Sequence, residues 1–181
     1  MDIDETLHRV RTGDRQAFAE IVRVYQGPLF HFLGNMGMSR GQVEDLAQDT
    51  FLRAWSNLGR YAPELGRFST WLFTIARRLA LNEIDRAGNR SEMLMGNDTA
   101  PDLPCERSLP HEALEQARRR AALHRALCQL PAADRTVLAL AYLREVDLAE
   151  IARIEACSVG AIKTRLHRAR HRLAQLLESP P

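Results

Sequence analysis

The sequence predicts an all-α protein with two small helical domains joined by a flexible linker. In both halves of the chain apolar residues recur every three or four positions, and no stretch alternates with a period of two. Between the halves, the segment 88–111 gathers proline and glycine and shows no sustained periodicity. With 181 residues, 45% of them hydrophobic, the chain is long enough to bury a core.

The first expected helix spans 14–26, with Asp14 as its N-cap and apolar residues at i, i+3, i+4 and i+7. Gly27 and Pro28 are expected to interrupt it, because proline lacks the amide hydrogen that a helix interior needs. A short apolar helix to about Asn35 should follow.

The clearest helical pattern runs over 39–58 and begins at Ser39, a favourable N-cap. Its repeat predicts one broad buried face, made of Val43, Leu46, Ala47, Thr50, Phe51, Ala54, Trp55 and Leu58. The glycines and the proline of 59–68 indicate a loop, and a fourth helix is expected over about 69–86.

The second half predicts helices at about 112–129 and 132–144, followed by a helix-turn-helix. Asp147 and Glu150 form a capping box for a short helix, 148–154. After a four-residue break, a long helix begins near Val159. Its expected inner residues are Val159, Ile162, Leu166, Ala169, Leu173 and Leu176. Its outer arc carries Lys163, Thr164, His167, Arg168 and His171. A cationic helix after a tight turn can enter a DNA major groove.

This segment, LPAADRTVLALAYLREVDLAEIARIEACSVGAIKTRLHRARHRL, resembles region four of bacterial sigma factors. The resemblance is to the extracytoplasmic-function (ECF) group of the sigma-70 family of RNA polymerase sigma factors. It implies that the outer arc reads the −35 promoter element through Lys163, Thr164, Arg165, His167 and Arg168. The family usually has glycine where Ala156 stands, so the turn is either compatible with alanine or altered.

The run EDLAQDTFLRAW resembles sigma region 2.2, which docks on core RNA polymerase. The resemblance assigns Asp45, Gln48, Asp49 and Leu52 to binding the clamp helices of the β′ subunit; the β subunit is a further expected partner. Acidic and amide groups suit a basic helical partner, because charge-assisted hydrogen bonds are strong.

The run GRFSTWLFTIARRLALNEIDR resembles the region that melts and reads the −10 element. Arg78, Asn82, Asp85 and Arg86 share one helical face, which Arg77 borders. Arginine can hold phosphate and asparagine can bond a base edge. In relatives the preceding loop captures a base extruded from the duplex, a task that aromatic faces suit. The implied −10 residues are Tyr61, Phe68, Trp71, Arg77, Arg78, Asn82 and Arg86.

The resemblance thus implies three parts: sigma region 2 over 1–90, a linker over 91–111 and sigma region 4 over 112–181. Residues 91–112 carry one arginine against five acids, which suits a positively charged polymerase channel. The implied partners are core RNA polymerase, promoter DNA and an anti-sigma factor. No signal peptide or membrane span is recognisable, so a cytoplasmic protein without membrane insertion is expected.

Three alternatives compete with this interpretation. A response regulator with a terminal helix-turn-helix needs an α/β receiver, whose strands the sequence lacks. A helical adaptor that binds only proteins would leave the basic face solvated. A zinc or redox sensor would use Cys105, His111, His124 and Cys128, which are better explained as ordinary helix residues. No phosphate loop, nucleophile elbow or paired-carboxylate pocket is recognisable, so neither an enzyme nor a cofactor is expected.

Overall fold

The computed structural model describes residues 2–93, 111–143 and 146–178, and every regular element in them is helical. Two 3-10 turns, Leu58–Arg60 and Pro63–Leu65, follow the third helix. The helices are α1 (Ile3–Arg11), α2 (Ala17–Asn35), α3 (Arg40–Ser56), α4 (Phe68–Met93), α5 (His111–Gln129), α6 (Ala132–Ala141), α7 (Leu148–Ile154) and α8 (Val159–Glu178). The predicted fold class is confirmed. Most of the predicted linker lies outside the described residues, as does Cys105.

The N-terminal segment forms a helix, α1, that the periodicity analysis did not predict. The Asp2 side chain caps it by accepting from the backbone N–H groups of Asp4, at 2.9 Å, and Glu5. Leu7 and Val10 bury their side chains against α2. Arg9 fixes the same contact through ion pairs across the connecting turn.

The predicted break at Gly27 and Pro28 is wrong: α2 continues through Pro28 to Asn35. Proline removes one intrahelical hydrogen bond. The helix nevertheless continues, because Leu29 and Phe32 just beyond it are completely buried. Burying such side chains contributes roughly 1.5–3 kcal/mol each, which outweighs a local preference to stop.

The helix predicted from Ser39 is confirmed as α3, with a complete capping box. The Gln42 amide N–H donates to Ser39 Oγ, and the Ser39 amide N–H donates to Gln42 Oε1 at 3.0 Å. The predicted inner face is buried except at Leu46, which is partly buried, and at Trp55, which is 36% exposed, so the expectation for Trp55 is wrong. Its ring meets the edge of Phe18 on α2 at a centroid distance of 4.9 Å and leaves the rest of the indole at the surface.

The helix-turn-helix is formed by α7 and α8. Asp147 and Glu150 make the predicted capping box, with the Glu150 amide N–H donating to Asp147 Oδ1 at 2.8 Å. Ala156 takes a left-handed backbone conformation, with φ +52°. Alanine is therefore compatible with the turn, but at a conformational cost that glycine avoids. Val159 is exposed, contrary to expectation, because it lies in the first turn of α8.

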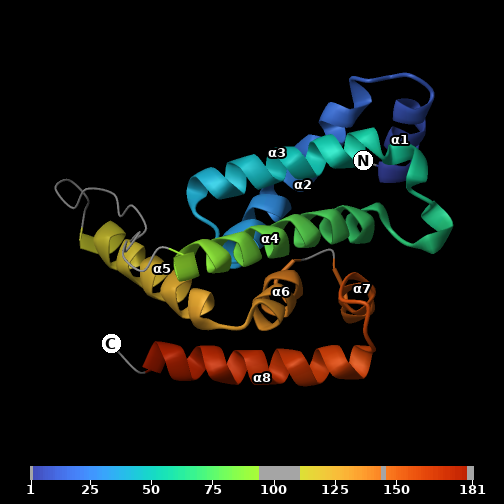
Figure 1. Ribbon diagram of the computed structural model, residues 1–181. Helices are drawn as coiled ribbons and strands as arrows, with labels where there is room; N and C mark the ends of the chain where they lie inside the picture. The colour runs from blue at the N-terminus through green and yellow to red at the C-terminus, as the bar shows by residue number, and fades with distance from the viewer. Residues whose placement is uncertain (1, 94–110, 144–145, 179–181) are drawn as a thin grey trace.

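The helices form a stack in which α6 and α7 lie between α4 and α8 (Figure 1). α2, α3 and α4 pack on one another above this layer, and α6 also contacts α2. One buried apolar cluster extends from Leu7 in α1 to Ala169 in α8. The two predicted domains therefore share an extended contact, called the joint below, formed by the ends of α2 and α4 against α6 and α7. No described helix is long and apolar enough to cross a membrane.

Candidate protein and nucleic-acid interfaces

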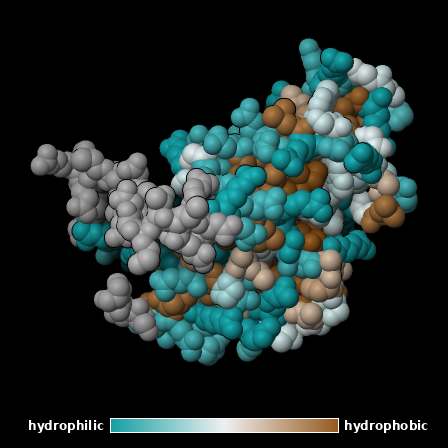
Figure 2. Space-filling view, viewed as in Figure 1, coloured by the Kyte–Doolittle hydropathy of each residue, from teal (hydrophilic) through white to brown (hydrophobic). Residues whose placement is uncertain are grey.

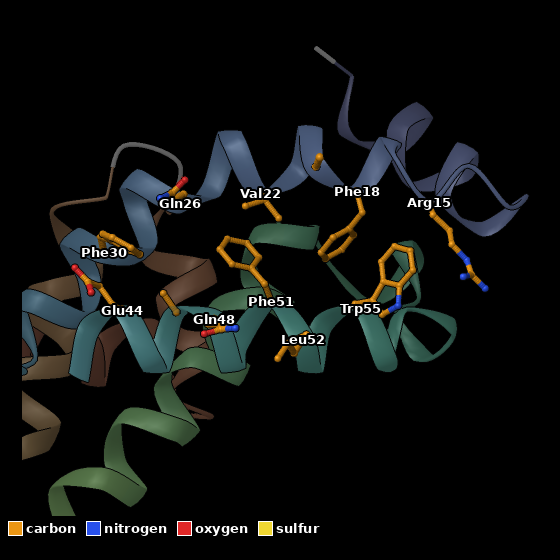
Figure 3. A pocket seen from close by; sticks show the side chains of 12 residues that line it. Arg15, Phe18, Val22, Gln26, Phe30, Glu44, Gln48, Phe51, Leu52 and Trp55 are labelled. Atoms are coloured by element: carbon orange, nitrogen blue, oxygen red, sulfur yellow. The ribbon is translucent and has the colours of Figure 1, made fainter. Parts of the chain in front are cut away.

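An apolar groove of about 650 Å³ runs between α2 and α3. In Figure 3, Phe18 and Val22 point from α2 towards α3, and Phe51 points back from α3. Leu52 stands at the surface with 55% of its area exposed. Phe18 and Phe51 are themselves buried, so the most exposed large apolar side chains at the groove are those of Leu52 and Trp55. Large exposed apolar side chains gathered in a groove are typical of a protein-binding site.

The predicted polymerase-binding residues divide between the groove and its neighbouring surface. Gln48 and Leu52 line the groove itself, whereas Asp45 and Asp49 are not among its lining residues. Asp45 is exposed, and Asp49 forms a 3.4 Å ion pair with Arg53 one turn along α3. On α3 the structure therefore brings together apolar residues that line the groove, called its apolar floor, and the neighbouring Asp45 and Asp49, called its acidic border.

Sequence reasoning missed the contribution of α2 to this surface. Phe18 and Val22 were interpreted only as core residues, and Phe30 was assigned to a separate short helix. All three line the groove. The apolar stripes of α2 and α3 are wider than their mutual contact, so part of each stripe remains uncovered. Stripe width was the signal available in the sequence.

The predicted −10 face of α4 is open to solvent at its centre. Arg78 and Asn82 are exposed, and Arg86 is exposed with its guanidinium 3.8 Å from Glu83. Arg77 differs, because its guanidinium is paired with the buried carboxylate of Glu155 in the turn after α7. Of the four polar residues that α4 is predicted to offer to the −10 element, three are therefore exposed and Arg77 is engaged in an ion pair.

The predicted base-capturing aromatics form a packed cluster. Tyr61 and Phe68 are buried, and Trp71 is half-buried. The three ring centroids lie 5.5–5.6 Å apart, within the range of favourable aromatic pairs. The Tyr61 hydroxyl donates to the Gly66 carbonyl at 3.1 Å, and burial raises the pKa of Tyr61. Leu65, at the tip of the loop, is the most exposed large apolar residue described, at 80%.

The outer arc of α8 is arranged as the sequence predicts. Ile162, Leu166 and Ala169 are buried against α6 and α7. The residues that face solvent are Lys163, Thr164, His167, Arg168 and His171. Arg165 is half-buried and donates to Glu155 Oε2 at 3.0 Å. In Figure 2 the edge of the molecule that α8 forms is largely hydrophilic.

Two buried glutamates of the helix-turn-helix bind α4 across the joint. The Thr70 hydroxyl donates to Glu150 Oε1 at 3.0 Å, so this carboxylate joins the modules as well as capping α7. Glu155 accepts from Arg77 of α4 and from Arg165 of α8. The Glu155 carboxylate therefore binds two arginines: Arg77, which is predicted to contact the −10 element, and Arg165, which is predicted to contact the −35 element.

A second contact joins the modules at the end of α2. Arg135 on α6 is buried and donates to the Met36 carbonyl at 2.9 Å. Burial lowers the pKa of this arginine. Gly37 lies against it with φ +84°, and a Cβ there would meet Arg135 Nη1 at 2.8 Å and Cys128 Sγ at 2.9 Å. Glycine is thus required both by the backbone and by the close approach.

The candidate metal site has little support among the described side chains. His124 Nδ1 lies 3.9 Å from Cys128 Sγ, one turn apart on α5, but a zinc site needs three or four protein ligands. Burial raises the pKa of the Cys128 thiol, which disfavours the metal-binding thiolate. No group of three potential ligands occurs in the described residues.

Comparison with known proteins decides the family. The family model of Sigma-70 region 2 matches residues 21–90, and that of Sigma-70 region 4 matches residues 120–173. The ECF RNA polymerase sigma factor SigW of Bacillus subtilis is 30% identical over 186 residues, covering 98% of this chain and 97% of the relative. The chain belongs to the ECF group of RNA polymerase sigma factors. Sigma factors are non-enzymatic transcription initiation factors.

Other relatives agree with this assignment. The RNA polymerase sigma-H factor of Pseudomonas aeruginosa is 28% identical to this sigma factor, with 96% and 93% of the two chains covered. Two solved structures share the fold at a TM-score of 0.69. One is CnrH in complex with the cytosolic domain of CnrY, at 24% identity and 97% coverage of each chain. The other is the sigma factor RpoE in complex with the anti-sigma factor NepR from Bartonella quintana, at 23% identity, covering 91% of this chain and 98% of that one.

Proposed function

We propose that this sigma factor docks on core RNA polymerase through the α2–α3 groove and directs the enzyme to promoters. The observation that carries the proposal is the combination in one chain of an uncovered apolar groove and a helix-turn-helix with an exposed basic arc. The first suits a protein partner and the second suits duplex DNA. The chain supplies recognition, and the polymerase supplies the chemistry, in the cytoplasm.

In this proposal residues 1–90 act as sigma region 2. Leu52 and Gln48 enter the polymerase interface from the groove. Asp45 and Asp49 beside them form charge-assisted hydrogen bonds with a basic partner, the β′ clamp helices. The apolar floor supplies most of the affinity, and the acidic border supplies specificity and rate of association.

The two DNA contacts differ in their target: α8 binds duplex DNA and α4 binds a strand that has been opened. Residues 112–181 act as sigma region 4, where Lys163, Thr164 and Arg168 of α8 meet base edges and phosphates in the −35 major groove. On α4, Arg78 and Asn82 hold the −10 strand as it opens. The linker 91–111 spans the distance between these elements along the polymerase.

An anti-sigma factor is the proposed regulator. Both solved neighbours with a TM-score of 0.69 are complexes, and one partner is named as an anti-sigma factor. A polypeptide with an apolar helix would fit the α2–α3 groove, because the groove is lined by side chains of two neighbouring helices. Such a partner would exclude core polymerase by occupying the same surface.

The test is binding of core RNA polymerase by the double variant Asp45→Arg, Asp49→Arg. We expect capture of core enzyme to be lost while the circular dichroism spectrum stays unchanged. The matched control is Glu115→Arg with Glu178→Arg, which alters net charge equally at exposed positions outside the groove. Wild-type binding by the first variant would overturn the docking assignment. Loss of binding in both would show that only net charge matters.

A further inference from the structure

The loop between α3 and α4 is held by α1, a helix that precedes the matched family region. That match begins at residue 21. α1 ends at Arg11, whose side chain crosses to the loop. Its Nη2 donates to the Leu58 carbonyl at 3.3 Å and also to the Tyr61 carbonyl. The guanidinium carbon lies 5.7 Å from the centroid of the Tyr61 ring, a cation–π distance.

These contacts restrain the loop at its beginning, at Tyr61 and, through Tyr61, at Gly66. The two carbonyls that Arg11 binds stand at either end of the first 3-10 turn. Tyr61 in turn restrains the second half of the loop, because its hydroxyl donates to the Gly66 carbonyl. Gly66 has φ +154° and ψ 172°, a conformation that is almost restricted to glycine. A planar guanidinium suits this task, since it offers several donors in a rigid fork.

A cavity of about 550 Å³, within the size range of small-ligand sites, lies between α1 and the loop, with Tyr25 of α2 and Arg153 of α7 completing its lining. Ile3 and Asp4 of α1 form part of one wall, and Tyr61 and Phe68 form part of another. The cavity therefore combines aromatic carbon with carboxylate and backbone groups. A flat heterocycle with hydrogen-bonding edges fits such a lining, and an extruded nucleobase is a ligand of this kind.

We propose that α1 is a positioning helix for promoter opening. Arg11 sets the conformation of the 59–68 loop, and the N-terminal turn of α1 completes the pocket that receives a base of the opened −10 strand. This inference rests on the proposed function, because it assumes that the loop meets single-stranded DNA. Arg11 acts through Tyr61 and the loop backbone, so it is a positioning residue with no required contact to the base.

The test compares Arg11→Ala with Arg9→Ala in holoenzyme assembled from core polymerase and the full chain. Arg9 is a matched control, because it is an arginine of the same helix that bonds only to Asp14 and Glu20. Forked promoter DNA carries a single-stranded −10 non-template strand with each of the four bases in turn at each position. The measured quantity is the ratio of affinities for the best and worst base.

We expect Arg11→Ala to reduce this ratio roughly fivefold to tenfold at one position, the size of a typical net hydrogen-bond contribution. Arg9→Ala should keep the wild-type ratio. Arg11→Gln, which retains an amide donor without the charge, should recover part of the discrimination. Core binding should be the same for all variants.

Wild-type base discrimination by Arg11→Ala would overturn the inference. An equal loss in Arg9→Ala would also overturn it, because α1 would then act only through general packing. The proposed function fails separately: in that case wild-type holoenzyme itself shows no preference among the forked promoters, or the wild-type chain does not bind core polymerase.

Discussion

The α2–α3 groove and the joint between the modules are opposite kinds of surface. The groove is apolar and uncovered, with Leu52 and Trp55 at the surface. The joint is closed and combines the continuous apolar core with buried charges, because Glu150 and Glu155 are buried against α4 and α8. A partner can enter the groove without any rearrangement of the fold. Arg77 and Arg165 stay partly exposed, but DNA has to compete with the buried Glu155 carboxylate for their guanidinium groups.

This difference has a consequence for the order of events in the proposed function. Polymerase docking comes first, because its surface is already accessible. In this proposal, promoter contact by Arg77 breaks its ion pair with Glu155 and loosens the joint, whereas Arg165 and Glu155 belong to the same module.

Arg135→Ala should have the largest effect on stability. It removes the buried hydrogen bond to the Met36 carbonyl and the packing under Gly37. We expect the free energy of unfolding to fall by about 2–4 kcal/mol, as for other lost buried networks. Denaturant titration measures this fall. The exposed Arg125→Ala on α5 is the control, and equal losses in both variants would show that Arg135 does not hold the joint.

Glu155→Gln should weaken the fold less but change DNA binding more. Loss of the carboxylate charge should lower the free energy of unfolding by about 1–2 kcal/mol and release Arg77 and Arg165 for phosphate contacts. Each added contact steepens the dependence of log affinity on log salt by about one. The slope on duplex DNA should therefore steepen by about one to two. Glu115→Gln, which frees only the exposed Arg119, is the comparison, and a slope unchanged from wild type would contradict the account.

Ala156→Gly should stabilise the protein slightly. Ala156 stands in the helix-turn-helix at φ +52°, where glycine has no Cβ penalty. The gain is partly offset by the greater freedom of glycine in the unfolded chain. We expect a net increase of about 0.5–1 kcal/mol in the free energy of unfolding. A decrease on thermal or denaturant unfolding would show that the methyl group makes a contact that outweighs the backbone strain.

Leu52→Ser should leave stability within about 0.5 kcal/mol of wild type, because the side chain is already half exposed. Affinity for core polymerase should nevertheless fall by about tenfold, as for a residue that anchors an interface. Leu177→Ser, at a similarly exposed position on α8, should change neither quantity. The groove assignment fails if Leu52→Ser binds core polymerase as well as Leu177→Ser does.

Local features of the fold were predictable from the sequence, whereas long-range contacts were not. The N-cap at Ser39 and the capping box at Asp147 depend on residues a few positions apart, and both are present. The error at Pro28 arose because burial of neighbouring residues, a tertiary effect, overrode a local signal. Likewise, Glu150 was predicted as a cap, but its bond to Thr70 joins residues 80 positions apart.

The candidate interfaces follow the same division. The outer arc of α8 was predictable from helical spacing, since its buried residues recur every three or four positions and leave the opposite face exposed. The groove needed the relative placement of α2 and α3, which periodicity within each helix does not contain. The pairing of Arg77 with Glu155 depends on how the modules meet, so it was not recognisable in either segment alone.

The most direct test of the contrast between groove and joint is the distance between the modules in solution. Spin labels on Ser56→Cys in α3 and Ala174→Cys in α8, both exposed positions, report it in a chain whose three native cysteines are replaced by alanine. For the free chain we expect one narrow distance distribution in double electron–electron resonance. Glu155→Gln should broaden it, and core polymerase with promoter DNA should shift it to longer distances. A broad distribution in the free wild-type background, unchanged by Glu155→Gln, would contradict the account.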